Sequence, residues 1–308
     1  MTALAWGRVL RLSLAPSAVA DVAAGLFIAH WGLFPPLSSV WPMLAASACV
    51  YHGGMALNDW ADRDDDARTR PERPIPSGEL RASHVGVVGA ALLVLAVGFA
   101  ALVSPAAAAW AAGLAALVLA YDFGSRGAWS GPFLLGACRA ANLAFGLLHA
   151  STLSDHFAHA LPRAWFALPL LYGAYVFSAS KIARLEDRAD DAGVGGVARV
   201  YAGLTALLLL APAVVDVQRE SALAPDLVAL AVAAAASWSL LRAAATTREW
   251  TRAACGRFTG LALRRLLVFT AVCVLSHRGA TSDGWVLALA ILAGFPLSAA
   301  LRRVFPPT

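Results

Sequence analysis

Residues 57–80, LNDWADRDDDARTRPERPIPSGEL, form a strongly charged segment within a chain that is otherwise apolar. Five aspartates fall within residues 59–66, and arginines and prolines follow them. Of the 308 residues, 59% are hydrophobic and only 14% are charged. Since about 25% of the residues of a soluble domain are charged, this composition excludes an ordinary soluble protein. The acidic segment is then the feature to explain.

Apolar runs occupy most of the chain on both sides of this segment. They are uncharged and about 17–25 residues long, so each can cross a bilayer as a helix. They are apolar on all sides instead of alternating, which excludes the strands of a membrane barrel. We predict an all-α polytopic membrane protein with a single transmembrane domain over residues 1–308. The predicted spanning helices are residues 16–34, 38–57, 84–103, 106–122, 131–150, 164–184, 197–217, 223–242, 259–277 and 283–301.

The helix boundary at residues 104–105, the N-terminal segment and the cysteines need separate comment. Ser104 and Pro105 separate the third helix from the fourth, and one long kinked helix is the alternative there. Residues 1–15 are short and basic, so we expect a first spanning helix after them and no cleavable signal peptide. The four cysteines lack metal-ligand spacing, and we interpret them as small core residues.

Basic residues are distributed unevenly between alternate loops. If the N-terminus is cytoplasmic, the loops on the opposite side receive only Arg163, Arg219 and Arg278. This is the positive-inside pattern, and it predicts an even number of spans. The net charge of +5 therefore reflects topology and not nucleic-acid binding. Both acidic segments, residues 59–66 and 186–191, follow even-numbered helices, so we expect both on the cytoplasmic side, where they could share one cavity.

The first acidic segment has the spacing of a metal site. Asn58, Asp62 and Asp66 are four residues apart, which on one continuous helix places their oxygens on a single face, with Asp59 beside them. Carboxylates at this spacing repel one another, so a cation must offset the repulsion. Mg²⁺ prefers oxygen ligands and binds through one or two carboxylates, water and substrate phosphates. The segment therefore predicts a site for a Mg²⁺–diphosphate, with Asp64 and Asp65 as solvated neighbours.

The second acidic segment, KIARLEDRADDAGVGG at residues 181–196, offers two pairs at the same spacing. These are Asp187 with Asp191 and Glu186 with Asp190, and periodicity alone does not choose between them. Solvated polar loops are the ordinary alternative for either acidic segment. Two such segments on one face favour a shared site.

Several basic residues stand near these acids and suit a diphosphate, although each also fits the topology. Arg139 differs from them because it lies in the middle of an apolar helix, where an ionisable side chain is costly and commonly functional. Asn142 shares its face, and Asp21 is a milder case near the start of the first helix. The basic candidates near the acids are Arg63, Arg70, Arg73, Lys181 and Arg184.

At these residues the chain resembles the UbiA superfamily of membrane prenyltransferases. The NDxxDxxxD motif of that family is complete at residues 58–66, and DRADDAGVG at 187–195 resembles its second motif, which selects Asp187 and Asp191. Residues 11–25 and 136–146 resemble a bacterial subgroup with poorly defined substrates. The Tyr-x-x-Pro-x-x-x-Lys stretch of many members is reduced here to Tyr121, with Arg126 in place of the lysine.

The resemblance implies a bundle of nine to ten helices around a central cavity, with residues 283–301 as a possible extra C-terminal helix. It implies Mg²⁺-dependent transfer of a prenyl group from a polyprenyl diphosphate to a hydrophobic, often aromatic, acceptor in the bacterial plasma membrane. The implied metal ligands are Asn58, Asp59, Asp62, Asp66, Asp187 and Asp191, of which the last four aspartates are the catalytic candidates. The implied diphosphate-binding residues are Arg70, Arg73, Arg126, Arg139, Asn142 and Lys181. Candidates for shielding the allylic cation, or for simple packing, are Tyr51, Tyr121, Tyr172 and Tyr175.

Three other functions are alternatives for a chain of this kind. A non-catalytic carrier of a lipid or aromatic intermediate could use the same fold, but it would not need a complete leaving-group site. A CDP-alcohol phosphotransferase requires a glycine directly after the first aspartate, which DWADR lacks. A soluble prenyl synthase is excluded by the hydrophobicity of the chain. We expect no nucleic acid and no obligate protein partner.

Overall fold

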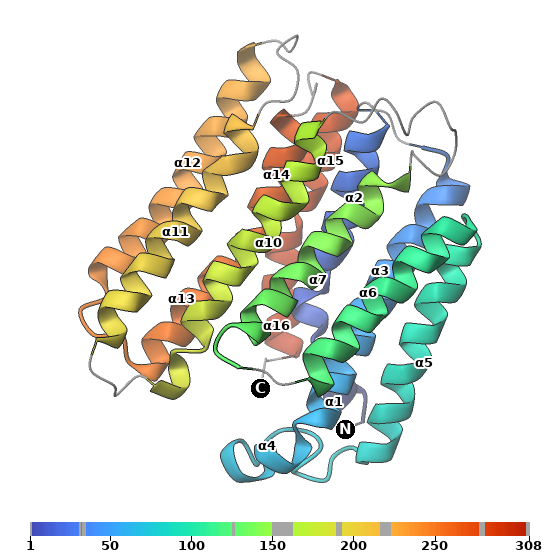
Figure 1. Cartoon of the computed structure of the whole chain (residues 1–308), viewed down its shortest axis with the longest axis vertical. Coiled ribbons are helices and arrows are strands. Elements are labelled where there is room, and N and C mark those ends of the chain that lie inside the picture. The colour runs from blue at the N-terminus through green and yellow to red at the C-terminus, as the bar shows by residue number, and fades with distance from the viewer. Residues whose placement is uncertain are drawn as a thin grey trace.

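The computed structural model describes residues 2–30, 32, 35–124, 127–149, 163–188, 193–215, 223–276 and 281–305. All regular structure in these ranges is helical, and the long helices run side by side in one bundle (Figure 1). The first half of the chain contains α1 (Thr2–Val9), η1 (Leu12–Leu14), α2 (Ala15–Ala29), α3 (Leu37–Ala61), α4 (Arg63–Thr69), α5 (Ala82–Ala101), α6 (Pro105–Phe123) and α7 (Ser130–Leu147). The second half contains α10 (Arg163–Ala183), η2 (Glu186–Arg188), α11 (Val194–Val214), α12 (Leu223–Thr246), α13 (Arg252–Arg264), α14 (Leu266–Ser276), α15 (Ser282–Leu292) and α16 (Gly294–Val304).

Each of the ten predicted helical segments falls on helices of the structure. The last two are each divided, into α13 with α14 at Arg265 and into α15 with α16 at Ala293. The alternative of one kinked helix over the third and fourth segments is wrong. The Ser104 hydroxyl oxygen caps α6 by accepting a hydrogen bond from the Ala107 N–H (3.0 Å), and Pro105 starts the new helix. α5 and α6 then lie side by side as a hairpin (Figure 1).

Both ends of the described chain lie at the same end of the bundle, where α4 also lies (Figure 1). The ring of Phe305 packs against Gly7, which joins the C-terminal segment to α1. An even number of membrane crossings brings the two termini to one side, so this arrangement agrees with the topology that the charge distribution predicts.

Seven segments of the described chain are long and apolar enough to cross a membrane. Three further helices, α3, α7 and α10, have 25, 18 and 21 residues but lie outside this set. These three carry several of the polar side chains that the sequence singled out, among them Asn58, Arg139 and Lys181. The seven segments are Leu12–Ala29, Ala82–Ala101, Pro105–Phe123, Val194–Val214, Asp226–Thr246, Arg252–Ser276 and Ser282–Val304.

The closest approach of α2 to α7 depends on two glycines. A Cβ atom on Gly25 would lie 2.6 Å from the Leu143 carbonyl oxygen, and one on Gly146 would collide with the Val22 carbonyl oxygen. Small residues let transmembrane backbones pack this closely. The contact fixes how Asp21 of α2 faces α7.

Gly146→Ala is expected to lower the stability of the bundle by about 1–3 kcal/mol, because the added methyl group must push α2 away from α7. The matched control is Gly113→Ala in α6, where an added Cβ meets nothing within 4 Å. The measurement is the thermal unfolding midpoint of the two variants in detergent. Equal midpoints for both variants would contradict the close contact of α2 with α7.

Candidate functional site

The first acidic segment is not one continuous helix. α3 ends at Ala61, the chain turns at Asp62, and α4 begins at Arg63. The one continuous helix predicted over Asn58, Asp62 and Asp66 is therefore wrong, although helical backbone hydrogen bonds still join Asp62 to Asn58 and Asp66 to Asp62. A new helix places three aspartates in its first turn, where negative charge is favourable, instead of inside a longer helix, where they would repel one another.

The break changes which side chains come together. Asn58, Asp59 and Asp66 are buried, whereas Asp62 is half-buried. The Asp66 N–H donates to the Asp62 carbonyl oxygen (2.8 Å) in a helical hydrogen bond, and Asp66 shares one cationic partner, Arg73, with Asp59. As expected from the sequence, Asp64 and Asp65 are solvated, with side chains 84% and 71% exposed.

Two arginines neutralise the buried acids. The Arg73 guanidinium lies 2.6 Å from the Asp66 carboxylate and 3.5 Å from Asp59, and it is itself buried. Arg11 lies 3.3 Å from Asp59, in a left-handed backbone conformation (φ 49°) at the turn between α1 and η1. Burial lowers the pKa of Arg11, but the Asp59 carboxylate together with Tyr51 and Tyr121 raises it by more, so the pKa lies above its usual value and Arg11 stays cationic.

Arg73 belongs to the Arg-Pro-rich segment, residues 70–78, which folds into turns against the motif. The Arg73 N–H donates to the Arg70 carbonyl oxygen (3.1 Å), and the Ser77 N–H donates to the Arg73 carbonyl oxygen (2.9 Å). Arg70 is half-buried directly after α4. The fold of this segment therefore places the buried Arg73 guanidinium beside the carboxylates of Asp59 and Asp66.

The second acidic segment follows α10, whose C-terminal end lies at the same end of the bundle as α4 (Figure 1). The backbone of Asp187 lies in η2, and its side chain is not described; Asp191 and Arg126 lie outside the described residues. The choice between the two acidic pairs thus stays open. Lys181 is buried, with its amino group 3.8 Å from the centre of the Trp129 ring and donating to the Ala128 carbonyl oxygen (2.8 Å).

A second polar cluster lies deeper in the bundle, around Asp21. The Asp21 carboxylate is fully buried and accepts hydrogen bonds from Arg139 (3.0 Å), Asn142 (3.1 Å) and Tyr172 (2.6 Å). Arg139 also donates to the Ser17 hydroxyl (3.0 Å). The sequence pointed to Arg139 and Asn142, but it did not reveal that both hold Asp21, or that Tyr172 joins them.

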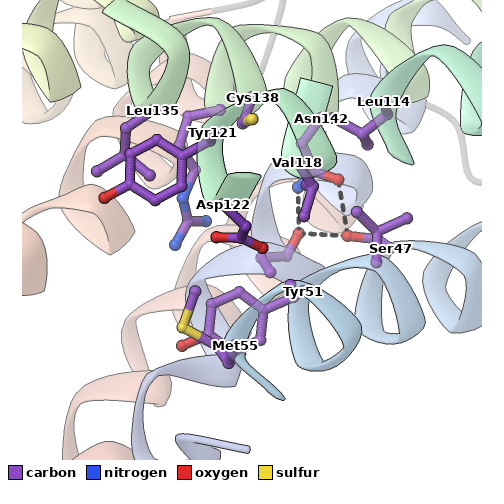
Figure 2. A pocket seen from close by; sticks show the side chains of 14 residues that line it. Ser47, Tyr51, Met55, Leu114, Val118, Tyr121, Asp122, Leu135, Cys138 and Asn142 are labelled. Carbon is purple, nitrogen blue, oxygen red and sulfur yellow. Dashed lines mark hydrogen bonds between the residues drawn. The ribbon is translucent and has the colours of Figure 1, made fainter. Parts of the chain in front are cut away.

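A cavity of about 100 Å³ lies between α3, α6 and α7, with one wall from α2. Figure 2 shows Tyr121 and Asp122 from α6 facing Tyr51 and Met55 from α3 across it. Of the four tyrosines considered for cation shielding, Tyr51 and Tyr121 line this cavity, and Tyr172 and Tyr175 are buried in the core. The lining residues are Ala18, Ser47, Val50, Tyr51, Gly54, Met55, Leu114, Val118, Tyr121, Asp122, Leu135, Cys138, Arg139 and Asn142.

Asp122 connects the cavity to the first acidic segment. Its carboxylate is buried and accepts a hydrogen bond from the Asn58 side-chain amide (3.2 Å). Sequence reasoning missed this residue. The available signal was a lone acid at the end of the apolar run 106–122, directly after Tyr121.

The donor chemistry of the first segment fits a hard cation. Asn58, Asp59, Asp62 and Asp66 offer only oxygen ligands to a metal, and the Arg73 guanidinium already places a positive charge between two of them. In the part of the chain that the structure describes, no three His, Cys, Asp or Glu side chains form a ready metal site. A metal bound here would therefore replace part of the present arginine pairing.

Comparison with known proteins gives a consistent result. The model of the UbiA prenyltransferase family matches residues 18–264. Over 78 residues the chain is 40% identical to digeranylgeranylglyceryl phosphate synthase of Ignicoccus hospitalis, covering 25% of this chain and 26% of that protein. Over 93 residues it is 41% identical to 4-hydroxybenzoate octaprenyltransferase of Cupriavidus necator, covering 29% of each. The matched stretches thus span less than a third of these relatives.

Solved structures share the fold at low identity. A UbiA homologue from Aeropyrum pernix K1 superposes with a TM-score of 0.64 and 16% identity, covering 94% of this chain and 98% of that one. A UbiA homologue from Archaeoglobus fulgidus, bound to GPP and Mg²⁺, superposes with a TM-score of 0.61 and 15% identity, covering 87% and 99%. The all-helical architecture predicted from the sequence is confirmed.

Proposed function

Because this chain belongs to the UbiA prenyltransferase family, we propose that it transfers a prenyl group from a prenyl diphosphate to a hydrophobic acceptor within the membrane, releasing diphosphate. One observation carries the proposal most directly. A buried set of oxygen donors, Asn58, Asp59 and Asp66, adjoins an apolar cavity through the hydrogen bond from Asn58 to Asp122. A diphosphate head and a hydrocarbon tail need these two environments side by side.

We propose that the acidic segments hold Mg²⁺, as the donor chemistry of the first segment allows. The homologue from Archaeoglobus fulgidus was solved with Mg²⁺ together with GPP or DMAPP, and this supports the same cation here. When bound, Mg²⁺ neutralises the negative charge that develops on the departing diphosphate. The proposed ligands are Asn58, Asp59, Asp62, Asp66, Asp187 and Asp191.

Basic residues at the same end of the bundle bind and orient the diphosphate in this proposal. Arg73 is already beside the acids and can donate to phosphate oxygens if it exchanges one carboxylate partner for the ligand. Arg70 precedes it on the same segment. Lys181, near the end of α10, contacts Ala128 and Trp129. Arg126 is proposed for this role from the sequence alone.

Arg139 and Asn142 lie deeper than the other proposed diphosphate ligands. Their donors hold the Asp21 carboxylate, and Arg139 also borders the cavity. Their contact with diphosphate stays a prediction, which the Arg139 variants described below test.

We propose that the protein lies in a bacterial plasma membrane with both acidic segments on the cytoplasmic side. The uneven distribution of arginine between alternate loops supports this orientation. The shared end of the bundle for α4 and both ends of the described chain agrees with it.

The function is tested with purified protein, labelled geranylgeranyl diphosphate, Mg²⁺ and a membrane-lipid extract as the source of acceptor. Asp62→Ala and Asp187→Ala are each expected to lower transfer by about 100-fold or more, since each removes a proposed ligand of the Mg²⁺ that would neutralise the leaving diphosphate. The matched control is Asp64→Ala, a neighbouring aspartate whose side chain is 84% exposed. If Asp62→Ala and Asp187→Ala both retain full activity, the mechanism is wrong. Movement of the labelled ligand without diphosphate release would instead favour a carrier.

A further inference from the structure

A pocket separate from the proposed reaction site lies where α12 ends and α13 begins. Its volume is about 610 Å³, which is within the roughly 300–1,000 Å³ typical of ligand pockets. One wall consists of the last turn of α12 with residues 247–249, and the other is one face of α13. None of its lining residues is a candidate ligand of the metal or the diphosphate. α12 lies at the edge of the bundle (Figure 1), so the pocket is peripheral.

Three arginines line this pocket, and they come from both walls. Arg248 follows α12, whereas Arg257 and Arg264 are seven residues apart on α13 and so lie on one face of that helix. Gly260 lies between them on the same wall. The Arg264 guanidinium is 3.8 Å from the place that a Cβ atom on Gly260 would take. The lack of a side chain at this position therefore leaves space beside the guanidinium.

The positive charge of these arginines is not balanced by ion pairs. In the part of the chain that the structure describes, no acidic side chain forms an ion pair with Arg248, Arg257 or Arg264. The charged groups that act on Arg264 are Arg302 and Arg265, which have the same sign. An anion bound in the pocket would relieve this repulsion.

The other polar groups of the pocket do not supply the missing negative charge in full. Glu249 is the one acid among the described lining residues and is exposed, and Glu186 reaches only the edge, beside Gly256. The hydroxyls of Thr246 and Thr247 donate to carbonyl oxygens of α12 (2.8 Å and 2.7 Å). The guanidinium groups are therefore the side-chain donors that remain for a ligand.

Apolar surface continues from the pocket along α12. Ala243 and Leu261 line the pocket itself. Trp238 and Leu241 precede it on α12, and they are 65% and 41% exposed. Topology explains why arginines lie at this end of the bundle, but it does not require three of them to converge on one pocket beside apolar surface. This combination fits a ligand with an anionic head and hydrocarbon chains.

We propose that this pocket binds the phosphate head group of an anionic phospholipid, with Arg248, Arg257 and Arg264 as donors to its oxygens. Basic pockets between transmembrane helices bind such head groups, and a guanidinium matches two phosphate oxygens at once. The acyl chains lie along α12, against Trp238 and Leu241. The site lies outside the prenyl-transfer site, so the inference does not depend on the proposed function.

Equilibrium binding of radiolabelled dioleoyl phosphatidylglycerol to the purified full-length protein in a neutral detergent tests the proposal. Dioleoyl phosphatidylcholine is the comparison, because it has the same chains and a phosphate but no net charge. The wild-type protein is expected to bind phosphatidylglycerol more tightly by about tenfold or more. Equal affinity for the two lipids overturns the proposal, and this comparison needs no variant.

A pair of double variants locates the binding. Arg257→Gln with Arg264→Gln is expected to lower the affinity for phosphatidylglycerol by about tenfold, and to leave that for phosphatidylcholine unchanged. The control is Arg81→Gln with Arg303→Gln, which removes the same charge from two exposed arginines elsewhere at this end of the bundle. The control is expected to stay within about threefold of wild type. Equal losses in the two double variants would show general surface attraction and overturn the proposal.

Two further measurements test the sign of the charge and the source of the phosphate. Glu249→Gln removes the acid of the pocket lining and is expected to raise the affinity for phosphatidylglycerol by about threefold. A lower affinity would contradict a phosphate beside Glu249. sn-Glycero-3-phosphoglycerol, the head group without chains, is expected to displace little of the bound lipid at equal concentration, because the chains contribute by burial. Displacement of half the lipid would assign the pocket to a soluble phosphate compound and overturn the assignment to a lipid.

Discussion

Asp66→Asn is expected to slow diphosphate release from the prenyl donor by about 10²- to 10³-fold. The substitution removes a buried carboxylate that is proposed to hold Mg²⁺ beside the leaving diphosphate. Asp66 is buried and pairs with Arg73 at 2.6 Å. The measurement is the initial rate of diphosphate release by purified protein. Asp65→Asn, one position away and 71% exposed, is the matched control and is expected to retain nearly full activity.

A double variant separates catalysis from structure at this position. If Asp66 serves only to neutralise Arg73, then Asp66→Asn combined with Arg73→Gln should recover activity, since neither charge is left buried alone. The account predicts no recovery, because the acid binds the metal and the arginine binds the diphosphate. Recovery of the double variant to within a few-fold of wild type would contradict this role of Asp66.

Arg139→Leu is expected to destabilise the protein by about 3–5 kcal/mol, because it leaves the carboxylate of Asp21 buried without its ion-pair partner. Asp21 is 0% exposed, and its remaining donors are Asn142 and Tyr172. The thermal unfolding midpoint in detergent measures the effect. Arg199→Leu on the exposed surface of α11 is the control, with little expected change.

The double variant Asp21→Leu with Arg139→Leu is expected to recover most of this stability, since replacing both members of a buried ion pair by apolar residues is often neutral. It also settles the second role considered for Arg139. An unchanged KM for the prenyl diphosphate in this folded variant would show that Arg139 stabilises the helix bundle and does not bind the diphosphate. A raised KM would show that Arg139 binds the diphosphate, as the sequence suggested. If Arg139→Leu is as stable as Arg199→Leu, the ion pair with Asp21 does not support the bundle.

The sequence predicted the helices well because their apolar runs are long and clearly bounded. Ser104 and Pro105 illustrate this, since a capping hydroxyl followed by proline marks the start of α6 without any tertiary information. The turn at Asp62 was missed for a physical reason. The four-residue spacing of Asn58, Asp62 and Asp66 describes a face only if the helix continues, and here the accumulation of charge is relieved by starting a second helix.

The partners of the interior polar residues could not be predicted from the sequence. Asp21 meets Arg139 and Tyr172 because Gly25 and Gly146 let α2 approach α7 closely, and such contacts depend on helix packing. Asp122 was missed because a single acid at the end of an apolar run is also typical of a helix end at the membrane surface. Its hydrogen bond to Asn58 appears only when α3 and α6 are placed side by side.

The central claim is that the acidic segments hold a metal-bound diphosphate, and equilibrium binding of a labelled, non-hydrolysable geranylgeranyl thiodiphosphate tests it most directly. The account predicts tight binding with Mg²⁺, a loss of about 100-fold or more in affinity with EDTA, and a similar loss for Asp59→Asn with Mg²⁺ present. Equal affinity with Mg²⁺ and with EDTA in the wild-type protein would contradict it.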